Sequence, residues 1–315
     1  MRALVTGGAG FIGSNLVDML LAEDHEVTVL DDLSSGYAEN IRDDIRFVRG
    51  DVSTPGAASD AAVGCGVIFH LAASVGNTRS IDNPVRDSEV NVIGTLRVLE
   101  AAREHGIGRI VFSSSAGIFG ELKTLPIAED HPQDPDSPYG ASKLAAEKMC
   151  LVYNKLYGMK NVALRYFNVY GVRQRYDAYG NVIPIFAERM LRGQDVTIFG
   201  DGEQTRDFVN AVEVARANYL AGMSADAAGS FNIGSGSRIS INELARVMDE
   251  YLGSGATIVH GDPRPGDVRD SLATIDAARD AFGFVPSVTL EEGLPKYLDW
   301  LRGDPVTLAR WKPRR

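Results

Sequence analysis

The sequence predicts an α/β protein: a doubly wound parallel sheet covered by helices on both faces, with a smaller C-terminal α/β lobe. Short β-rich apolar runs alternate with longer helical patterns through the first half of the 315-residue chain. These runs are continuously apolar, as is typical of parallel strands buried on both faces. After about residue 170 the pattern loosens. We expect one domain at 1–170, to which later segments return, a lobe at 171–303, and a basic tail at 304–315 whose end, "ARWKPRR", is frayed.

The predicted elements follow in order along the chain. Strands are expected at 2–7, 26–31, 45–51, 67–73, 109–115 and 161–168, because these runs are bounded by Gly, Asp or Ser. Helices are expected at 11–24, 84–106 and 137–157, between those strands. In the second lobe we expect a polar loop at 171–181, short strands with turns at 192–209, and amphipathic helices at 240–252 and 289–302.

Composition limits the kind of partner. The formal charge of −10, with 42 acidic and 32 basic residues, argues against a nucleic-acid or membrane-surface binder. No run of about 18 apolar residues is present, so no membrane span is predicted. The two cysteines, Cys65 and Cys150, have no metal-ligand spacing and suggest reduced core thiols. We therefore expect a soluble, cytoplasmic protein without a metal site.

A glycine pattern predicts a dinucleotide site. Gly7, Gly10 and Gly13 directly follow the first predicted strand and open the first predicted helix. Glycines let the backbone approach a pyrophosphate, and the N–H groups of a helix N-terminus attract its charge. Phe11 and Ile12, which complete the pattern, belong to the same predicted site.

Acidic residues close the next two strands. Asp31 and Asp32 end the second strand, where a carboxylate can accept the hydroxyls of an adenosine ribose. A carboxylate repels a 2′-phosphate and no arginine adjoins it, so the pattern favours NAD over NADP. Asp51 and Val52 follow the third strand and are predicted to meet the adenine edge.

The stretch "SPYGASK" carries a tyrosine and a lysine four positions apart. In a helix this spacing places Tyr139 and Lys143 on one face, one turn apart. The free phenol has a pKa near 10, and a neighbouring ammonium stabilises its anion. Tyr139 is therefore a candidate proton acceptor.

These motifs together point to a family. "TGGAGFIG", "LDDLSSG", "HLAA", "NVIGTLRVLEAA", "FSSSAGIFG", "SPYGASK", "RYFNVYG", "FGDGEQTRDFV", "FNIGSG" and "RPGD" occur in this order nearly from end to end. The sequence resembles the extended short-chain dehydrogenase/reductases, specifically the NAD-dependent nucleotide-sugar epimerases of the UDP-galactose 4-epimerase type. The resemblance implies a Rossmann-type sheet, bound NAD and a UDP-sugar substrate.

The resemblance also implies a reaction. Tyr139 would take a proton from the 4-hydroxyl of the sugar, Lys143 would bond the nicotinamide ribose, and Ser115 would hydrogen-bond the reacting oxygen. C4 would give hydride to NAD⁺, and the 4-keto sugar would turn over and retrieve it on the opposite face. Related dehydratases carry Asp-Glu after the serine and decarboxylases usually carry Glu, whereas this chain has Ala116 and Gly117. We therefore expect an epimerase.

Further positions match the family's binding shell. The remaining cofactor positions implied are Leu71, Ala72, Ala73, Asn91, Ser113 and Tyr166. The substrate positions implied are Asn168, Asn181, Arg206, Arg264, Asp267 and Ser271.

The sugar is left open between three classes. Ser271, at a position where the family often has a bulky tyrosine or a small residue, would leave room for an N-acetyl group or a differently tilted sugar. Arg79 and Arg175 lie in loops expected to border the hexose and could clamp a C6 carboxylate, which would indicate UDP-glucuronate. In the alternative, Arg175 serves the UDP phosphates and Arg79 faces solvent, or pairs with Asp82 or Asp87. A neutral UDP-glucose or UDP-galactose remains the third option.

Rival functions share the scaffold. A dehydrogenase, dehydratase or decarboxylase would alter the redox state or composition of the sugar, and a non-catalytic dinucleotide-binding protein would need no Tyr139 or Ser115. Relatives commonly form dimers through the helices that correspond to 84–104 and 137–157, so the resemblance implies a homodimer.

Overall fold

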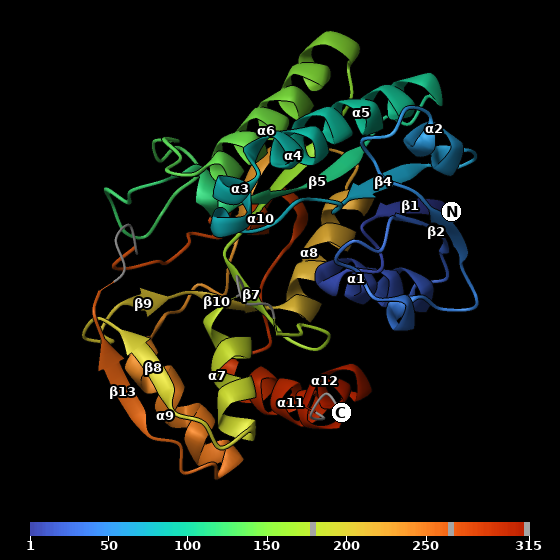
Figure 1. Cartoon of the computed structure of the whole chain (residues 1–315). Coiled ribbons are helices and arrows are strands. Elements are labelled where there is room, and N and C mark those ends of the chain that lie inside the picture. Colours follow the sequence, from blue (N-terminus) through green and yellow to red (C-terminus); the bar gives the residue numbers. More distant parts are fainter. Residues whose placement is uncertain (177–180, 264–267, 312–315) are drawn as a thin grey trace.

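A seven-stranded parallel sheet forms the centre of the molecule (Figure 1). The computed structural model describes residues 1–176, 181–263 and 268–311. In sheet order the strands are β11 (Gly229–Ile233), β6 (Val162–Tyr166), β5 (Ile110–Ser115), β4 (Val67–His70), β1 (Arg2–Thr6), β2 (Glu26–Asp31) and β3 (Arg46–Arg49). The six predicted strands are confirmed as β1 to β6. β11 was not predicted, and it returns to the sheet from the second half of the chain.

Helices cover both faces of this sheet. On one face lie α1 (Phe11–Ala22), α8 (Ala211–Met223) and α10 (Asp276–Phe282), and on the other α2 (Ala57–Ala62), α5 (Thr95–Glu104) and α6 (Pro138–Tyr157). Successive residues of a strand enter opposite cores: Val5 packs with α1 and α8, whereas Leu4 packs with α5 and α6. The doubly wound fold class is thereby confirmed.

The predicted helix 84–106 is divided into three parts. After α3 (Asn77–Asp82), the segment forms α4 (Pro84–Ser88), a π-helical turn η2 (Glu89–Gly94) and α5. The side chain of Asn83 accepts the N–H of Arg86 at 3.2 Å and caps α4. The hydroxyl of Thr95, the first residue of α5, donates to the carbonyl of Asn91 in η2 at 2.6 Å. Such wide turns often mark functional sites.

The C-terminal lobe consists of short paired strands and three helices. β7 (Asn168–Tyr170) pairs with β10 (Phe208–Asn210), β8 (Val196–Phe199) with β13 (Ile258–Gly261), and β9 (Thr205–Arg206) with β12 (Ile239–Ser240). α7 (Val182–Leu191), α9 (Ile241–Leu252) and α11 (Leu290–Gly303) enclose a core that includes Ile183, Leu244 and Leu298. The predicted helices at 240–252 and 289–302 are confirmed as α9 and α11.

The described part of segment 304–315 differs from the frayed tail that we expected. It forms helix α12 (Pro305–Trp311). Asp304 is only 4% exposed, and its carboxylate accepts the backbone N–H and the hydroxyl of Thr307, both at 2.8 Å. An aspartate at this position is a strong N-cap, which explains why the helix begins here. Among the described residues, no helix is long and apolar enough to cross a membrane.

Candidate active site

The glycine loop connects β1 to α1. Gly7 has a φ of +73°, and a Cβ there would lie 2.6 Å from the backbone nitrogen of Ala72. A Cβ on Gly13 would lie 2.1 Å from the carbonyl oxygen of Gly7, so the helix can approach the strand only without a side chain. Gly10 is the N-cap of α1 and offers no side-chain cap. The open helix N-terminus at Phe11 therefore suits a pyrophosphate, and the residues present fit a dinucleotide.

Asp31 joins the second strand to this loop. Its carboxylate accepts the backbone N–H of Ala9 at 3.0 Å and that of Leu33 at 2.8 Å, one on each oxygen. Burial raises the pKa of Asp31 above its ordinary value, the two hydrogen bonds oppose this, and the charge of Asp32 adds to it. Each carboxylate oxygen can accept a further hydrogen bond, as a ribose would require. Asp32 accepts the N–H and hydroxyl of Ser34 at 2.9 and 2.6 Å.

Asp51, at the end of the third strand, is held by charged and polar neighbours. Its carboxylate accepts Arg86 at 2.5 Å and the hydroxyl and N–H of Ser53, each at 2.7 Å. Burial alone would raise the pKa of Asp51, but the hydrogen bonds of Arg86 and Ser53 outweigh it and lower the pKa. Val52 is 4% exposed and packs in the core beside the sheet.

Asn91 lies at the centre of a buried polar cluster in η2. Its Nδ2 donates to the Ser74 carbonyl at 3.0 Å, to Ser142 Oγ at 3.0 Å and to Asp87 Oδ1 at 3.1 Å, and its Oδ1 accepts the Ser74 N–H at 2.9 Å. The Ser142 hydroxyl in turn donates to Asp87 at 2.5 Å. Because Ser142 precedes Lys143, the cluster fixes η2 against the helix that carries the predicted catalytic pair.

Tyr139 and Ser115 come together. α6 begins with Ser137, which accepts the Gly140 N–H at 3.1 Å, so Tyr139 lies in its first turn. The side chains of Tyr139 and Ser115 both lie within 4 Å of the position that a Cβ on Gly117 would occupy, so they are neighbours. Desolvation raises the pKa of Tyr139 and the charge of Asp87 adds to this, whereas the neighbouring Ser115 hydroxyl lowers it. The net pKa is therefore above the ordinary value, so the phenol needs further positive charge to ionise near neutrality.

Gly117 adjoins this pair. It lies in the short 3-10 turn η3 (Ala116–Ile118) that follows β5. A Cβ on Gly117 would lie 3.3 Å from Ser115 Oγ and 3.7 Å from Tyr139 Cε1. A longer side chain at this position would start beside the reactive groups, and the glycine supplies none.

Lys143 is buried one turn after Tyr139. It is 2% exposed, and burial lowers the pKa of its ammonium to about 8, although the nearby Cys150, Asp87 and Glu147 oppose this. Burial and the charge of Lys143 also lower the pKa of His70 to about 3. His70 is therefore neutral near pH 7 and cannot repel the lysine.

A buried ion pair fixes α6 against the sheet. Glu147 Oε1 and Arg165 Nη2 are 2.7 Å apart, and their side chains are 0% and 3% exposed. The hydroxyls of Ser114 and Ser230 donate to the same carboxylate at 2.6 and 2.8 Å. Glu147 follows Lys143 by one turn and Ser114 precedes Ser115. The pair thus sets the distance between the helix and the strand that carry the reactive residues.

The other predicted cofactor positions lie at the ends of the strands. The N–H groups of Leu71 and Ala72 bond to Thr6 at 3.0 and 3.2 Å, and Ala73 follows them. Ser113 is 7% exposed in β5. The Tyr166 hydroxyl donates to Asn218 at 2.9 Å, and burial raises the pKa of Tyr166.

The predicted substrate residues lie in several elements. Asn168 Nδ2 donates to the Asp207 carbonyl and Asn181 Nδ2 to the Val169 carbonyl, both at 3.3 Å. Ser271 is 7% exposed, and its N–H donates to the Thr205 carbonyl at 3.1 Å. Arg264 and Asp267 lie outside the described residues. Arg79 is half-buried in α3, next to Ser80, whose hydroxyl accepts the Tyr139 N–H at 3.0 Å.

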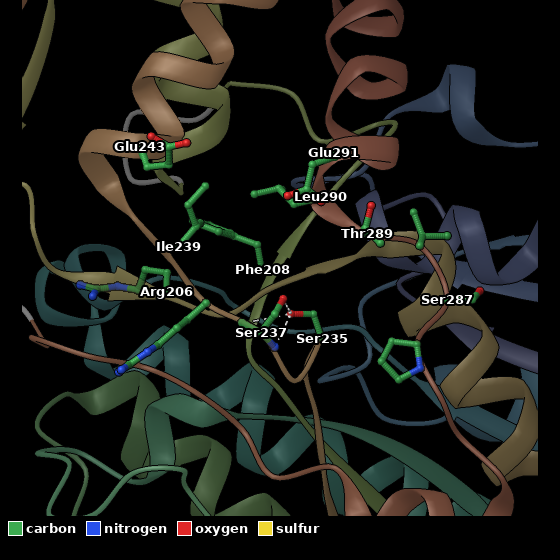
Figure 2. A pocket seen from close by; sticks show the side chains of 13 residues that line it. Arg206, Phe208, Ser235, Ser237, Ile239, Glu243, Ser287, Thr289, Leu290 and Glu291 are labelled. Atoms are coloured by element: carbon green, nitrogen blue, oxygen red, sulfur yellow. Dashed lines mark hydrogen bonds between the residues drawn. The ribbon is translucent and has the colours of Figure 1, made fainter.

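Arg206 lines a pocket of about 520 Å³ in the C-terminal lobe (Figure 2). Ser235 and Ser237 after β11, Glu243 in α9 and Thr289 before α11 also face it. The pocket contains neither the glycine loop nor the Ser115–Tyr139 pair. It is therefore separate from the predicted site of reaction.

The structure corrects the prediction for Arg175. Its guanidinium forms a bidentate pair with Asp304, with Nε–Oδ2 and Nη2–Oδ1 distances of 2.9 and 2.8 Å. The two side chains are 5% and 3% exposed. Because the fork is already occupied within the protein, a clamp on a substrate carboxylate by Arg79 and Arg175 together does not form in this arrangement.

Sequence reasoning missed several residues of this site. Asp87, Ser142, Ser80, Glu147 and Arg165 all bond to the elements that carry Tyr139 and Ser115. A charged residue within an otherwise apolar strand, as at Arg165, was the one local signal that a buried partner exists.

Comparisons with known proteins agree with this geometry. The model of the NAD dependent epimerase/dehydratase family matches residues 3–234. The UDP-glucose 4-epimerase of Mycolicibacterium smegmatis is 41% identical over 309 residues, which cover 96% of this chain and 99% of that protein.

Solved structures are similar over the whole fold. The UDP-glucose 4-epimerase of Thermotoga maritima, solved with UDP-glucose, has a TM-score of 0.92 and 39% identity, covering 96% of this chain and 99% of that chain. The UDP-N-acetylglucosamine 4-epimerase of Methanobrevibacter ruminantium, in complex with UDP-N-acetylmuramic acid, has a TM-score of 0.91 and 36% identity, covering 95% and 97%. With the glycine cradle and the Ser115–Tyr139 pair, these matches identify the chain as an enzyme of the NAD-dependent epimerase/dehydratase family.

Proposed function

We propose that this enzyme is a UDP-sugar 4-epimerase that inverts C4 of a hexose through a transient 4-keto sugar. Tyr139 accepts the proton of the 4-hydroxyl and returns it after the sugar has turned over. Ser115 hydrogen-bonds the same oxygen and keeps it within reach of Tyr139. Bound NAD supplies the oxidation and reduction at C4 and, when oxidised, a positive charge near Tyr139. No net change in redox state results.

The charge balance of the site supports this role for Tyr139. The residues of the chain alone raise its pKa, so ionisation depends on cations brought near the phenol. Lys143 supplies one such cation while it is protonated, which its pKa of about 8 permits at neutral pH. We expect it also to hold the nicotinamide ribose, as the resemblance implies.

The position of Gly117 is the observation that favours epimerisation over elimination or decarboxylation. Elimination or decarboxylation on this scaffold would use an acid beside the reacting carbon. The Cβ direction of Gly117 leads toward Ser115 Oγ and Tyr139, and neither Ala116 nor Gly117 can exchange a proton. Simple epimerisation needs only the serine and the tyrosine.

We propose UDP-glucose and UDP-galactose as the substrates. Relatives at 39% and 41% identity are named UDP-glucose 4-epimerases. The pairing of Arg175 with Asp304 disfavours a uronate, because one half of the expected carboxylate clamp is occupied. The second candidate is a UDP-N-acetylhexosamine, favoured by the small Ser271 and by the relative from Methanobrevibacter ruminantium.

One assay panel separates these substrates. UDP-glucose, UDP-N-acetylglucosamine and UDP-glucuronate are each incubated with the enzyme, and the products are resolved by chromatography while NADH absorbance is followed. We expect UDP-galactose from UDP-glucose at constant NADH. A pentose product or steady NADH release would instead indicate a decarboxylase or a dehydrogenase and overturn the proposal.

We also propose that the enzyme is a homodimer. Exposed apolar side chains gather on the outer helices: Val85 in α4 is 69% exposed, Ile93 in η2 43%, and Leu156 in α6 66%. These helices lie side by side in Figure 1. A second copy placed on this face would give the four-helix interface that the resemblance implies.

A further inference from the structure

We infer that Arg175 and Asp304 are positioning residues for NAD, because they hold the segment that fixes the carbonyl of Ala9 in the glycine loop. This inference rests on the use of NAD and is independent of which sugar is epimerised. Neither residue touches the glycine loop itself, so the effect passes through the side chains between them. Three contacts, taken in order, make this connection.

The first contact anchors Arg175. Asp304 binds it through two parallel hydrogen bonds and is itself held by Thr307 at the start of α12. Burial alone would raise the pKa of Asp304, but the bonds from Arg175 and Thr307 outweigh it and lower the pKa. The aspartate therefore stays ionised, and the bidentate geometry fixes the plane of the guanidinium.

The second contact links Arg175 to the segment after β2. The guanidinium carbon lies 4.2 Å from the centre of the Tyr37 ring and 5.5 Å from that of Trp300 in α11. Its Nη1 donates to Asn40 Oδ1 at 3.5 Å. A buried planar cation held between two aromatic rings restrains both. Tyr37, the N-cap of the short 3-10 turn η1 (Ala38–Asn40), and Asn40, its last residue, are thereby placed by Arg175.

The third contact reaches the glycine loop. The Tyr37 N–H and the Asn40 Nδ2 both donate to the carbonyl of Ala9, at 3.0 and 2.9 Å. The N–H of Ala9 is held by Asp31, the residue predicted to bind the ribose. Ala9 is fully buried and immediately precedes Gly10, the N-cap of α1. A shift of Tyr37 and Asn40 would therefore move the peptide that presents the helix N-terminus to the pyrophosphate.

The loop that carries Arg175 is also bonded to α1. Asn15 Nδ2 donates to the Val172 carbonyl at 3.1 Å, and Arg173 pairs with Asp18 at 2.6 Å. Arg175 thus lies in a segment held against the first helix on one side and against the C-terminal segment on the other. The cofactor loop, α1 and α12 share one set of restraints.

The experiment measures NAD binding directly. Asp304→Asn keeps the size of the side chain but removes the charge that fixes Arg175. Equilibrium dialysis of the full-length protein with NAD should show a dissociation constant raised roughly tenfold or more. The KM for the UDP-sugar, measured at saturating NAD, should change less than about twofold. The rise in melting temperature that NAD produces should shrink accordingly.

A stability control separates positioning from folding. Leu298→Ala creates a cavity in the core of the C-terminal lobe and should lower the melting temperature while leaving the NAD dissociation constant unchanged. Arg175→Lys is the second variant if Asp304→Asn fails to fold, because it keeps the charge but loses the fork. If the folded variant melts earlier and binds NAD as tightly as the wild type, the pair is only structural and the inference is overturned. If the control variant Leu298→Ala also loses NAD binding, the inference is overturned as well.

Discussion

The ammonium of Lys143 lies 4.4 Å from the centre of the Phe112 ring, inside the protein and beneath the strand that ends at Ser115. An aromatic face partly replaces the water that a buried cation loses, and it does so without accepting its proton. The lysine can therefore act as a fixed positive charge. Burial nevertheless lowers its pKa to about 8, so that charge is conditional on pH.

We predict that kcat/KM falls on the alkaline side with an apparent pKa near 8. The pKa of Lys143 is lowered from its ordinary value, so the ammonium is lost as the pH rises through about 8, and the phenolate of Tyr139 then loses a stabilising cation. Lys143→Arg should move this limb to higher pH, because arginine stays charged. Lys148→Arg, at an exposed position of the same helix, should leave the profile unchanged. A limb that persists in Lys143→Arg would assign the titration to another group.

Tyr139→Phe should abolish turnover and spare NAD binding. The variant keeps the ring and its packing but removes the oxygen that we propose takes the 4-hydroxyl proton, so we expect a loss of at least roughly 10²-fold in kcat. Tyr153→Phe removes a phenol that bonds Glu100 at the far end of α6, and it should keep full activity. Turnover and NAD content are measured on the same preparations. Near-normal activity in Tyr139→Phe would contradict the proposed mechanism.

Glu147→Gln should destabilise the fold by about 3–5 kcal/mol, because it leaves Arg165 buried without a counter-charge. Denaturant unfolding measures this loss. Glu100→Gln breaks an exposed pair with Arg103 and should cost no more than about 1 kcal/mol.

The same pair makes stability depend on pH. Burial alone would raise the pKa of Glu147, but Arg165, Ser114 and Ser230 outweigh it and lower the pKa. The stabilisation is therefore fully present above the ordinary carboxyl pKa and is lost as the pH falls through the lowered value. Unfolding midpoints measured between neutral and acid pH should converge for wild type and Glu147→Gln at the acid end. A constant difference between the two proteins over that range would contradict this assignment.

Val85→Asp combined with Leu156→Asp should convert the proposed dimer into a monomer. Both side chains are well exposed in one chain, and a dimer would bury the new carboxylates without partners. Sedimentation or light scattering reports the mass. Val63→Asp, at a position beyond α2 that is 51% exposed, should leave the mass unchanged. If the wild-type protein has the mass of a single chain, the proposal of a homodimer is wrong.

The sheet and the reactive residues could be predicted from local patterns of the sequence. The strands, the glycine loop and the one-turn spacing of Tyr139 and Lys143 depend on residues close together in the chain. β1 to β6 lie within the predicted ranges, most of them shorter than predicted, and Tyr139 and Lys143 lie in one helix. β11 escaped prediction because its short run follows a loosened pattern and is defined by pairing with β6.

Contacts between distant residues could not be predicted. Arg175 and Asp304 are 129 residues apart, and no period or spacing connects them. The loop position of Arg175 suggested a ligand, since an arginine in a loop has no local reason to be buried. Nothing in the basic C-terminal segment indicated that Asp304 would be buried against that loop. Only the three-dimensional arrangement shows that Arg175 and Asp304 are buried because they pair with each other.

The wide turn at η2 has a consequence for how this gene can change. Asn91, inside the turn, is bonded to Ser142, and Val98 and Leu99 of α5, after the turn, are fixed in the core. Each residue of a helix turns the chain by about 100°, so deleting one residue between them would rotate one set away from its partners. A single-codon deletion here would therefore be as damaging as a substitution of Asn91. The site therefore depends on the number of residues between Asn91 and Val98 as well as on their identity.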